Sequence, residues 1–131
     1  MKKSDPGKDP KQVGILGEKI ARDFLASRGY KILETNFRTP FGEIDIIGGR
    51  SGLTVFFEVK TRISEKYGAP LSSITPVKKK HIIKSVEYYL GSDTRKKERI
   101  RIDAISIKLN ERCELEVLKH IKNAIEKEIK H

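Results

Sequence analysis

The chain has 131 residues, of which 35% are charged and 37% are hydrophobic, and its formal net charge is +10. This length fits one domain, and the surplus of positive charge favours a polyanionic partner, either nucleic acid or an anionic membrane surface. The single cysteine, Cys113, excludes an intramolecular disulfide and a cysteine-rich zinc site. Neither a membrane-spanning apolar stretch nor the apolar core of a signal peptide is present, so the sequence predicts a cytoplasmic protein without a membrane partner.

The N-terminal part of the chain divides into an arm and a helix. Residues 1–12 are polar, include two prolines and lack periodicity, which predicts a flexible basic arm before a single domain of residues 13–131. Apolar residues recur at helical spacing from residue 13 to 28, and Gly29 is typical of a helix end. Glu18 lies at the edge of this apolar stripe. It is either a surface residue paired with Arg22 or part of a functional site.

A strand over residues 30–37 is followed by two strands that form a hairpin. The runs 42–47 and 55–62 are rich in β-branched and aromatic residues and flank a glycine-rich segment. With a two-residue turn at the end of that segment, Asp45 lies directly opposite Glu58.

Two opposed carboxylates in apolar strands need an explanation, because like charges directly opposite each other destabilise a sheet. A neighbouring cation such as Lys60 could neutralise the pair, or a divalent metal could bind between the carboxylates. The same register places Glu43 opposite Lys60. The other face of the hairpin is apolar and predicts a covering helix; it comprises Ile44, Ile46, Val55, Phe57 and Val59.

Two side chains outside the strands are candidate contacts to a nucleic acid. Arg38 precedes a predicted turn at residues 39–42, where it either belongs to the turn or holds a phosphate. Tyr67 lies in a loop of about a dozen residues that leaves the strand carrying Glu58. It could stack on a base or pack as a lid over the site.

A second helix is predicted from Pro76 to Leu90, with Thr75 as its cap and Gly91 as its stop. Lysines occupy its first turns at positions 78, 79, 80 and 84, although a helix N-terminus prefers acidic residues. This placement indicates that an anion binds there. We expect a phosphate contact from Lys80 first and from Lys78 second.

The C-terminal third predicts a strand at residues 100–109, an edge strand at 115–120 and a short charged helix at 123–130. Asp103, within the first of these strands, is expected to pair locally with a basic residue rather than to bind metal. The predicted element order is α-β-β-β-α-β-β-α, an α/β domain with a mixed β-sheet flanked by helices.

The hairpin motif resembles that of a known superfamily. An acidic residue, a gap of 12 residues and Glu58-Val59-Lys60 resemble the PD-(D/E)XK nucleases, with Ile44-Asp45 in place of the Pro-Asp pair. A wider pattern resembles the YraN-like family, which is similar to archaeal Holliday-junction resolvases, over roughly residues 14 to 125. Its matching positions are Gly17-Glu18, Ala21, Leu25, Gly29-Tyr30, Asn36, Gly42-Glu43-Ile44-Asp45, Phe57-Glu58-Val59-Lys60-Thr61-Arg62, Tyr67-Gly68 and Lys80.

This resemblance implies a restriction-endonuclease-like core and a metal-dependent endonuclease that hydrolyses DNA phosphodiester bonds, including those of branched or otherwise structured DNA. Asp45, Glu58 and Glu18 would hold Mg²⁺ or Mn²⁺, and Lys60 would orient or deprotonate the attacking water. Arg62 would contact the phosphate, helped by the second helix. Resolvase-like enzymes act as dimers, so a homodimer is one option.

Two alternatives stay open. The chain could be a nucleic-acid-binding protein that keeps the nuclease fold without cleaving. The carboxylates and Lys60 could also form only a salt-bridged ladder in a basic protein of unrelated role, in which case a divalent metal would not stabilise the fold.

Overall fold

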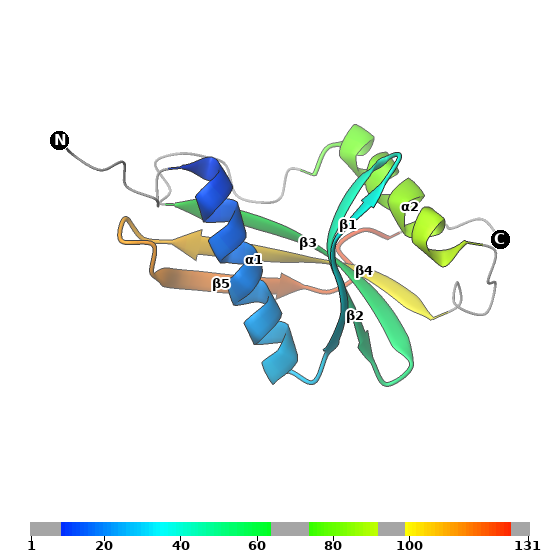
Figure 1. Cartoon of the computed structure of the whole chain (residues 1–131), viewed down its shortest axis with the longest axis horizontal. Helices are drawn as coiled ribbons and strands as arrows, with labels where there is room; N and C mark the ends of the chain where they lie inside the picture. Colours follow the sequence, from blue (N-terminus) through cyan, green and yellow to red (C-terminus); the bar gives the residue numbers. More distant parts are fainter. Residues whose placement is uncertain (1–8, 64–73, 92–98, 127–131) are drawn as a thin grey trace.

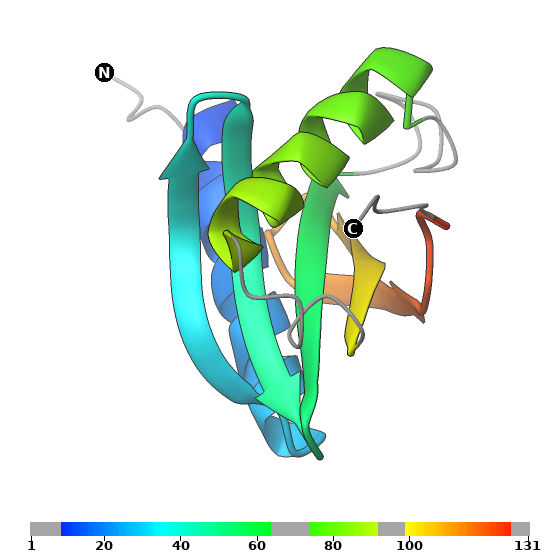
Figure 2. The ribbon, with the colours of Figure 1, turned by 90° about the vertical axis from the view of Figure 1, so that its right-hand side faces the viewer.

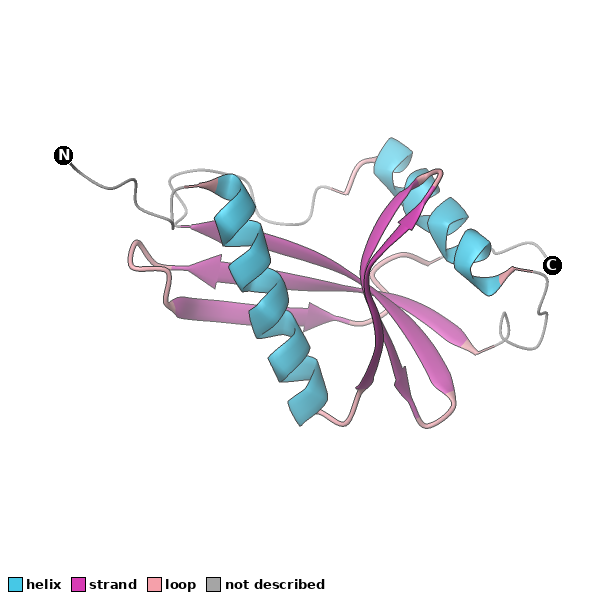
Figure 3. Cartoon of the chain, in the orientation of Figure 1, coloured by secondary structure: helices cyan, strands magenta, loops and turns pink. Residues whose placement is uncertain are grey.

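The computed structural model describes residues 9–63, 74–91 and 99–126. A five-stranded sheet with the strand order β1-β2-β3-β4-β5 carries one helix on each face (Figures 1 and 3). The elements are α1 (Pro10–Ser27), β1 (Lys31–Thr39), β2 (Gly42–Arg50), β3 (Leu53–Ile63), α2 (Pro76–Leu90), β4 (Ile100–Leu109) and β5 (Leu115–Ile121). The β3–β4 pair is parallel and the other pairs are antiparallel, so the predicted mixed α/β sheet with flanking helices is confirmed.

Helix α1 begins earlier than the sequence pattern predicts. The Asp9 carboxylate accepts a hydrogen bond from the Lys11 backbone N–H at 3.0 Å, and Pro10 occupies the first helical position. Residues 10–12, assigned to the arm by the sequence, therefore belong to the helix, and residues 1–8 lie outside the described part. A side chain at Gly17 would overlap the Thr61 hydroxyl, so this glycine lets α1 lie directly on β3.

Helix α2 has the predicted bounds. The Thr75 hydroxyl accepts a hydrogen bond from the Lys78 backbone N–H at 3.1 Å, and Gly91 ends the helix at a positive φ of 61°. Figure 2 shows α2 in front of β2 on the face of the sheet opposite α1, and α2 contacts β2 and β1. The chain between β3 and β4 thus supplies the crossover that a parallel pair requires.

The sheet separates two cores. The α1 core includes Leu25, Ile46 and Phe57, whereas the α2 core includes Phe56 and Val86. The sequence predicted that Ile44 lies on the same face as Ile46, but Ile44 is 4% exposed and packs in the α2 core. The reason is that the pairing of β2 with β3 ends at Ile46. The residues of β2 that precede Ile46 twist together with β1 toward α2 (Figure 1).

The predicted C-terminal helix is wrong over residues 123–126, which form a turn after β5. Asn123 adopts a positive φ of 54°, which interrupts helical geometry, and Ile125 is buried in the α2 core at 2% exposure. Burial of this apolar side chain outweighs the helix propensity of the charged segment. Residues 127–131 lie outside the described part.

Candidate functional site

The candidate site lies where the β2–β3 ladder ends. The paired residues run from Arg50↔Leu53 to Ile46↔Phe57, which is the register that the sequence predicts. Asp45 and Glu58 are the next residues on the two strands. Instead of continuing the ladder, the Asp45 carboxylate accepts a hydrogen bond from the Val59 backbone N–H at 2.8 Å. A side-chain oxygen of Asp45 thus takes the place of a main-chain carbonyl as the acceptor for the Val59 N–H. The two strands separate at Asp45 and Glu58.

Burial and neighbouring charge act strongly on Asp45. Desolvation, then the charge of Glu58, raises the pKa of Asp45 from 3.8 to about 7, against the hydrogen bond from Val59, which lowers it. Glu18 and Glu43 add smaller repulsions in the same direction. In the described part of the chain, Asp45 forms no salt bridge. Of the described cations, Lys78 acts on Asp45 as a charge without forming a close ion pair with it.

Two lysines contact the other acid. Glu58 is 9% exposed, and its Oε1 lies 3.1 Å from Lys78 Nζ and 3.5 Å from Lys60 Nζ. Burial, then a hydrogen bond with Lys78, lowers the pKa of Lys60. Burial also lowers the pKa of Lys78, but the hydrogen bond with Lys60 and the charge of Glu58 outweigh it and leave that pKa raised. The pKa values of the two amines are therefore shifted in opposite directions, lowered for Lys60 and raised for Lys78.

Glu18 and Glu43 reach the site through an asparagine. Asn36 Nδ2 donates to Glu18 Oε1 at 2.8 Å and to Glu43 Oε1 at 3.1 Å. Asn36 itself has a positive φ of 49°, a conformation that asparagine tolerates better than most residues. The predicted pairing of Glu43 with Lys60 is wrong, because the strands have already separated at this level. Glu43 instead lies 3.5 Å from Arg38.

The predicted contact residues are not all at the carboxylates. Lys80 is exposed, and the described residues include no hydrogen-bond or ion-pair partner for it. Arg62 is half-buried on β3, two residues beyond Lys60, and Arg38 is 88% exposed beside Glu43. Tyr67 lies outside the described residues. The structure thus brings together Asp45, Glu58, Lys60 and Glu18.

Lys78 is the first-turn lysine that contacts a site acid, whereas the sequence analysis named Lys80 first as a phosphate contact. It occupies the third position of α2, and the Thr75 cap directs this first turn over the end of the hairpin. The signal was available in the capping pattern, which gives the position of each lysine in the first turn. The orientation of α2 relative to the sheet decides that Lys78 rather than Lys80 contacts Glu58. That orientation could not be predicted from the sequence.

Asp103 has the structural role that the sequence predicted. This carboxylate is 1% exposed and accepts two hydrogen bonds from Arg101, at 2.8 and 2.9 Å. It also lies 2.7 Å from His120 Nε2, and it accepts a bond from the Asn123 backbone N–H at 2.9 Å. Sequence reasoning assigned no role to His120, because its partner lies 17 residues away on another strand. All these partners are local to β4 and β5, so Asp103 is separate from the candidate site.

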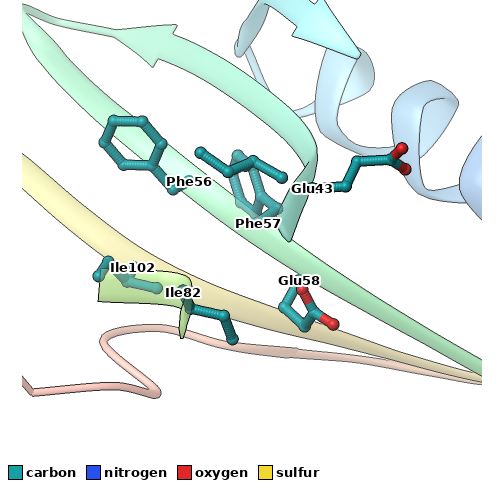
Figure 4. A pocket seen from close by; sticks show the side chains of 7 residues that line it. Glu43, Phe56, Phe57, Glu58, Ile82 and Ile102 are labelled. Carbon is teal, nitrogen blue, oxygen red and sulfur yellow. The ribbon is translucent and has the colours of Figure 1, made fainter. Parts of the chain in front are cut away.

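The donor set is compatible with a hard cation, although it is not a complete cage. Within residues 9–63, 74–91 and 99–126, no three acidic, histidine or cysteine side chains meet closely enough to hold a metal. Mg²⁺ typically uses one or two protein carboxylates and takes its other ligands from water and substrate phosphate. A small pocket joins Glu43 and Glu58 to an apolar wall of Phe56, Ile82 and Ile102, and the two carboxylates point away from the phenyl ring of Phe56 (Figure 4).

Fold and site together define an α/β domain with a carboxylate–lysine cluster at the open end of a hairpin. A family model described as uncharacterised protein family UPF0102 matches residues 17–107. The chain belongs to this family, which is the YraN-like group that the sequence pattern predicted.

Relatives extend over most of the chain. A UPF0102 protein of Caldanaerobacter subterraneus subsp. tengcongensis is 44% identical over 115 residues, covering 87% of this chain and 94% of the relative. Another from Thermodesulfovibrio yellowstonii is 44% identical over 113 residues, covering 86% and 95%. Among solved structures, Pyrococcus furiosus SfsA in complex with Ca²⁺ superposes with a TM-score of 0.42 at 16% identity, over 91% of this chain and 66% of that chain. No described helix is both long and apolar enough to cross a membrane.

Proposed function

We propose that this protein is a metal-dependent endonuclease that hydrolyses DNA phosphodiester bonds, including those of branched or structured DNA. One observation carries the proposal: Asp45, a half-buried acid that forms no ion pair with the described residues, adjoins Glu58, a buried acid that contacts two lysines. Stability alone does not favour this arrangement, since the two negative charges repel each other and Asp45 is partly desolvated.

Asp45 and Glu58 are the residues that would hold Mg²⁺ or Mn²⁺, with Glu18 as a further ligand directly or through water. When bound, the ion would supply a Lewis acid for the phosphate and a more acidic water. Metal binding would replace the proton that the raised pKa keeps on Asp45 below about pH 7.

Lys60 and Lys78 have different roles in the proposed reaction. Lys60, whose pKa is lowered, can accept a proton from the attacking water as a general base. Lys78 keeps its charge and can stabilise the negative charge that develops on the phosphate. Arg62 and Lys80 remain our candidates for contacts to phosphates beyond the one that is cleaved.

DNA cleavage with Mg²⁺ or Mn²⁺ tests the proposal. Supercoiled plasmid, nicked duplex and four-way junctions would be incubated with wild-type protein, Asp45→Asn and Lys60→Met. We expect cleavage by wild type, a loss of at least a hundredfold in both variants, and unchanged DNA binding. Removal of metal by EDTA should abolish cleavage. Cleavage that persists in Asp45→Asn would contradict the assigned site.

A non-cleaving nucleic-acid-binding protein is the second candidate. The observation that favours it is the Lys78–Glu58 ion pair at 3.1 Å, which already neutralises one of the two acids without a metal. In that case wild-type protein binds DNA with equal affinity in EDTA and in Mn²⁺, and none of the three substrates is cut.

A further inference from the structure

Affinity for DNA needs an origin outside the carboxylate cluster. Asp45, Glu58, Glu18 and Glu43 make the surroundings of the site acidic, and the lysines beside them are engaged by Glu58. Phosphate groups are repelled by such a surface until a metal arrives. Cations that bind a DNA backbone should therefore be sought elsewhere on the molecule, whose formal net charge is +10.

Four exposed cations gather at the other end of the sheet: Arg28, Lys31, Arg50 and Arg99, which we call the arginine cluster. This end comprises the C-terminus of α1, the start of β1, the β2–β3 turn and the start of β4, and Figure 1 shows the first three at the bottom of the molecule.

Contacts within the described residues place these cations side by side. The Arg50 guanidinium lies over the Tyr30 ring, 5.4 Å from its centre, and its Nε lies 3.6 Å from the position that a Cβ would take at Gly29. Arg28 directly precedes that glycine. The Lys31 backbone pairs with Gly49, next to Arg50. On the other side of the turn, Arg99 Nη2 donates to the Ser51 carbonyl oxygen at 3.2 Å.

The partners of these side chains are neutral. Arg28 and Arg50 lie over the rings of Phe24 and Tyr30, and Arg99 holds a carbonyl oxygen. With the residues that the structure describes, none of the four cations forms a salt bridge. Asp103, the nearest described acid on β4, is buried and already bound by Arg101. The charges are thus held in place by aromatic and main-chain contacts while remaining available to an anion.

The position of the cluster fits a long polyanion. Along α1, Arg28 lies ten residues beyond Glu18, which corresponds to about 15 Å. Along β3, Leu53 lies five residues before Glu58, which corresponds to about 17 Å. A DNA strand rises by about 3.4 Å per base pair, so the cluster lies about five base pairs from the carboxylates.

We infer that the arginine cluster is a second nucleic-acid contact surface, which binds the phosphate backbone about five base pairs from the site of hydrolysis. This inference deepens the proposed function and rests on it for the location of the cleaved bond. The planar guanidinium groups suit bidentate contact with phosphate oxygens. Binding here is insensitive to base sequence, since only the backbone is contacted.

Fluorescence anisotropy with a labelled 30-base-pair duplex, in EDTA and over a range of salt, tests the inference without requiring cleavage. The variants are Arg28→Gln/Lys31→Gln, which leaves the Tyr30 stack intact, and the triple variant with Arg50→Gln added. The matched control is Arg112→Gln/Lys119→Gln. It removes the same charge as the double variant, from the turn between β4 and β5 and from β5 itself.

Each lost phosphate contact reduces the slope of log K against log salt by about 0.9. We therefore expect the magnitude of the slope to decrease by about 2 in the double variant and by about 3 in the triple variant. The affinity for DNA should be at least tenfold weaker. The control should keep a wild-type slope. A wild-type slope in the triple variant, or equal losses in variant and control, would overturn the inference. The inference would also be overturned if the triple variant kept its DNA binding but lost binding to anionic lipid vesicles.

The outcome is separable from that of the proposed function. If the cluster binds DNA but wild-type protein never cuts, the inference of a contact surface holds and the endonuclease proposal fails. If wild type cuts and the triple variant binds normally, the reverse is true.

Discussion

The raised pKa of Asp45 predicts an unusual dependence of stability on pH. Below about pH 7 the folded protein holds a proton on Asp45, whereas the unfolded chain has released it above about pH 3.8. Between these values the folded state binds more protons than the unfolded state. The free energy of unfolding therefore falls as pH rises through this window and levels off above it.

The magnitude follows from the shift. A change from 3.8 to about 7 spans about three pKa units, each of about 1.4 kcal/mol, so ionised Asp45 destabilises the fold by about 4 kcal/mol at pH 8. Asp45→Asn removes this ionisation while its amide oxygen can still accept the Val59 N–H. At pH 8 in EDTA we expect the variant to be more stable than wild type by a few kcal/mol, with the difference vanishing toward pH 4.

Urea denaturation of both proteins at half-unit intervals from pH 4 to 8.5 measures the effect. Subtraction of the two curves cancels the contributions of every other titrating group. Adding Mn²⁺ at pH 8 should then stabilise wild type alone, by about 2.7 kcal/mol at 100 times the dissociation constant. Parallel curves over the whole range would refute the argument that burial and Glu58 act on this carboxylate. Equal stabilisation by Mn²⁺ would place any bound metal elsewhere.

Three further substitutions, the first with a matched control, test other parts of the structure. Gly17→Ala should destabilise the protein by about 1–3 kcal/mol in urea denaturation, because its methyl group overlaps Thr61; Gly14→Ala, which meets no atom within 4 Å, should be neutral or stabilising by up to about 1 kcal/mol. Lys78→Met should lower kcat for DNA cleavage at least tenfold while leaving Mn²⁺ affinity equal or tighter, and a weaker affinity would show that the lysine supports the metal. Asp103→Ala should cost about 1–3 kcal/mol by thermal unfolding, because the half-buried Arg101 guanidinium and the Asn123 N–H lose their acceptor, and an unchanged Tm would deny this carboxylate its structural role.

The hairpin and α2 are the parts that sequence alone predicts well. Turn chemistry and strand alternation give the β2–β3 register. For α2, Thr75 with Pro76 and the closing Gly91 define both ends. These signals are local, since each is carried by residues within one element or one turn. The closeness of the two site acids follows from the same local information, although the ladder ends at the residue pair before them.

Other features depend on how elements pack together. The strand separation at Asp45 depends on the twist of β1 and β2 toward α2, and the choice of Lys78 over Lys80 depends on the rotation of α2 on the sheet. Asn36 joins α1 to β2 through a left-handed conformation that the strand pattern conceals. The C-terminal turn was missed because burial of Ile125 is a tertiary effect.

The parallel β3–β4 pair has a consequence for the order in which the protein assembles. The β2–β3 hairpin closes over a short loop, so its two acids can meet on a microsecond timescale. Lys78 reaches them only when α2 docks on the sheet, and closing that longer loop costs more conformational entropy. Lys60 lies on the hairpin itself, so it can contact Glu58 as soon as the hairpin forms. The ion pair between Lys78 and Glu58 needs chain segments far apart in sequence to dock, which makes it a product of late folding.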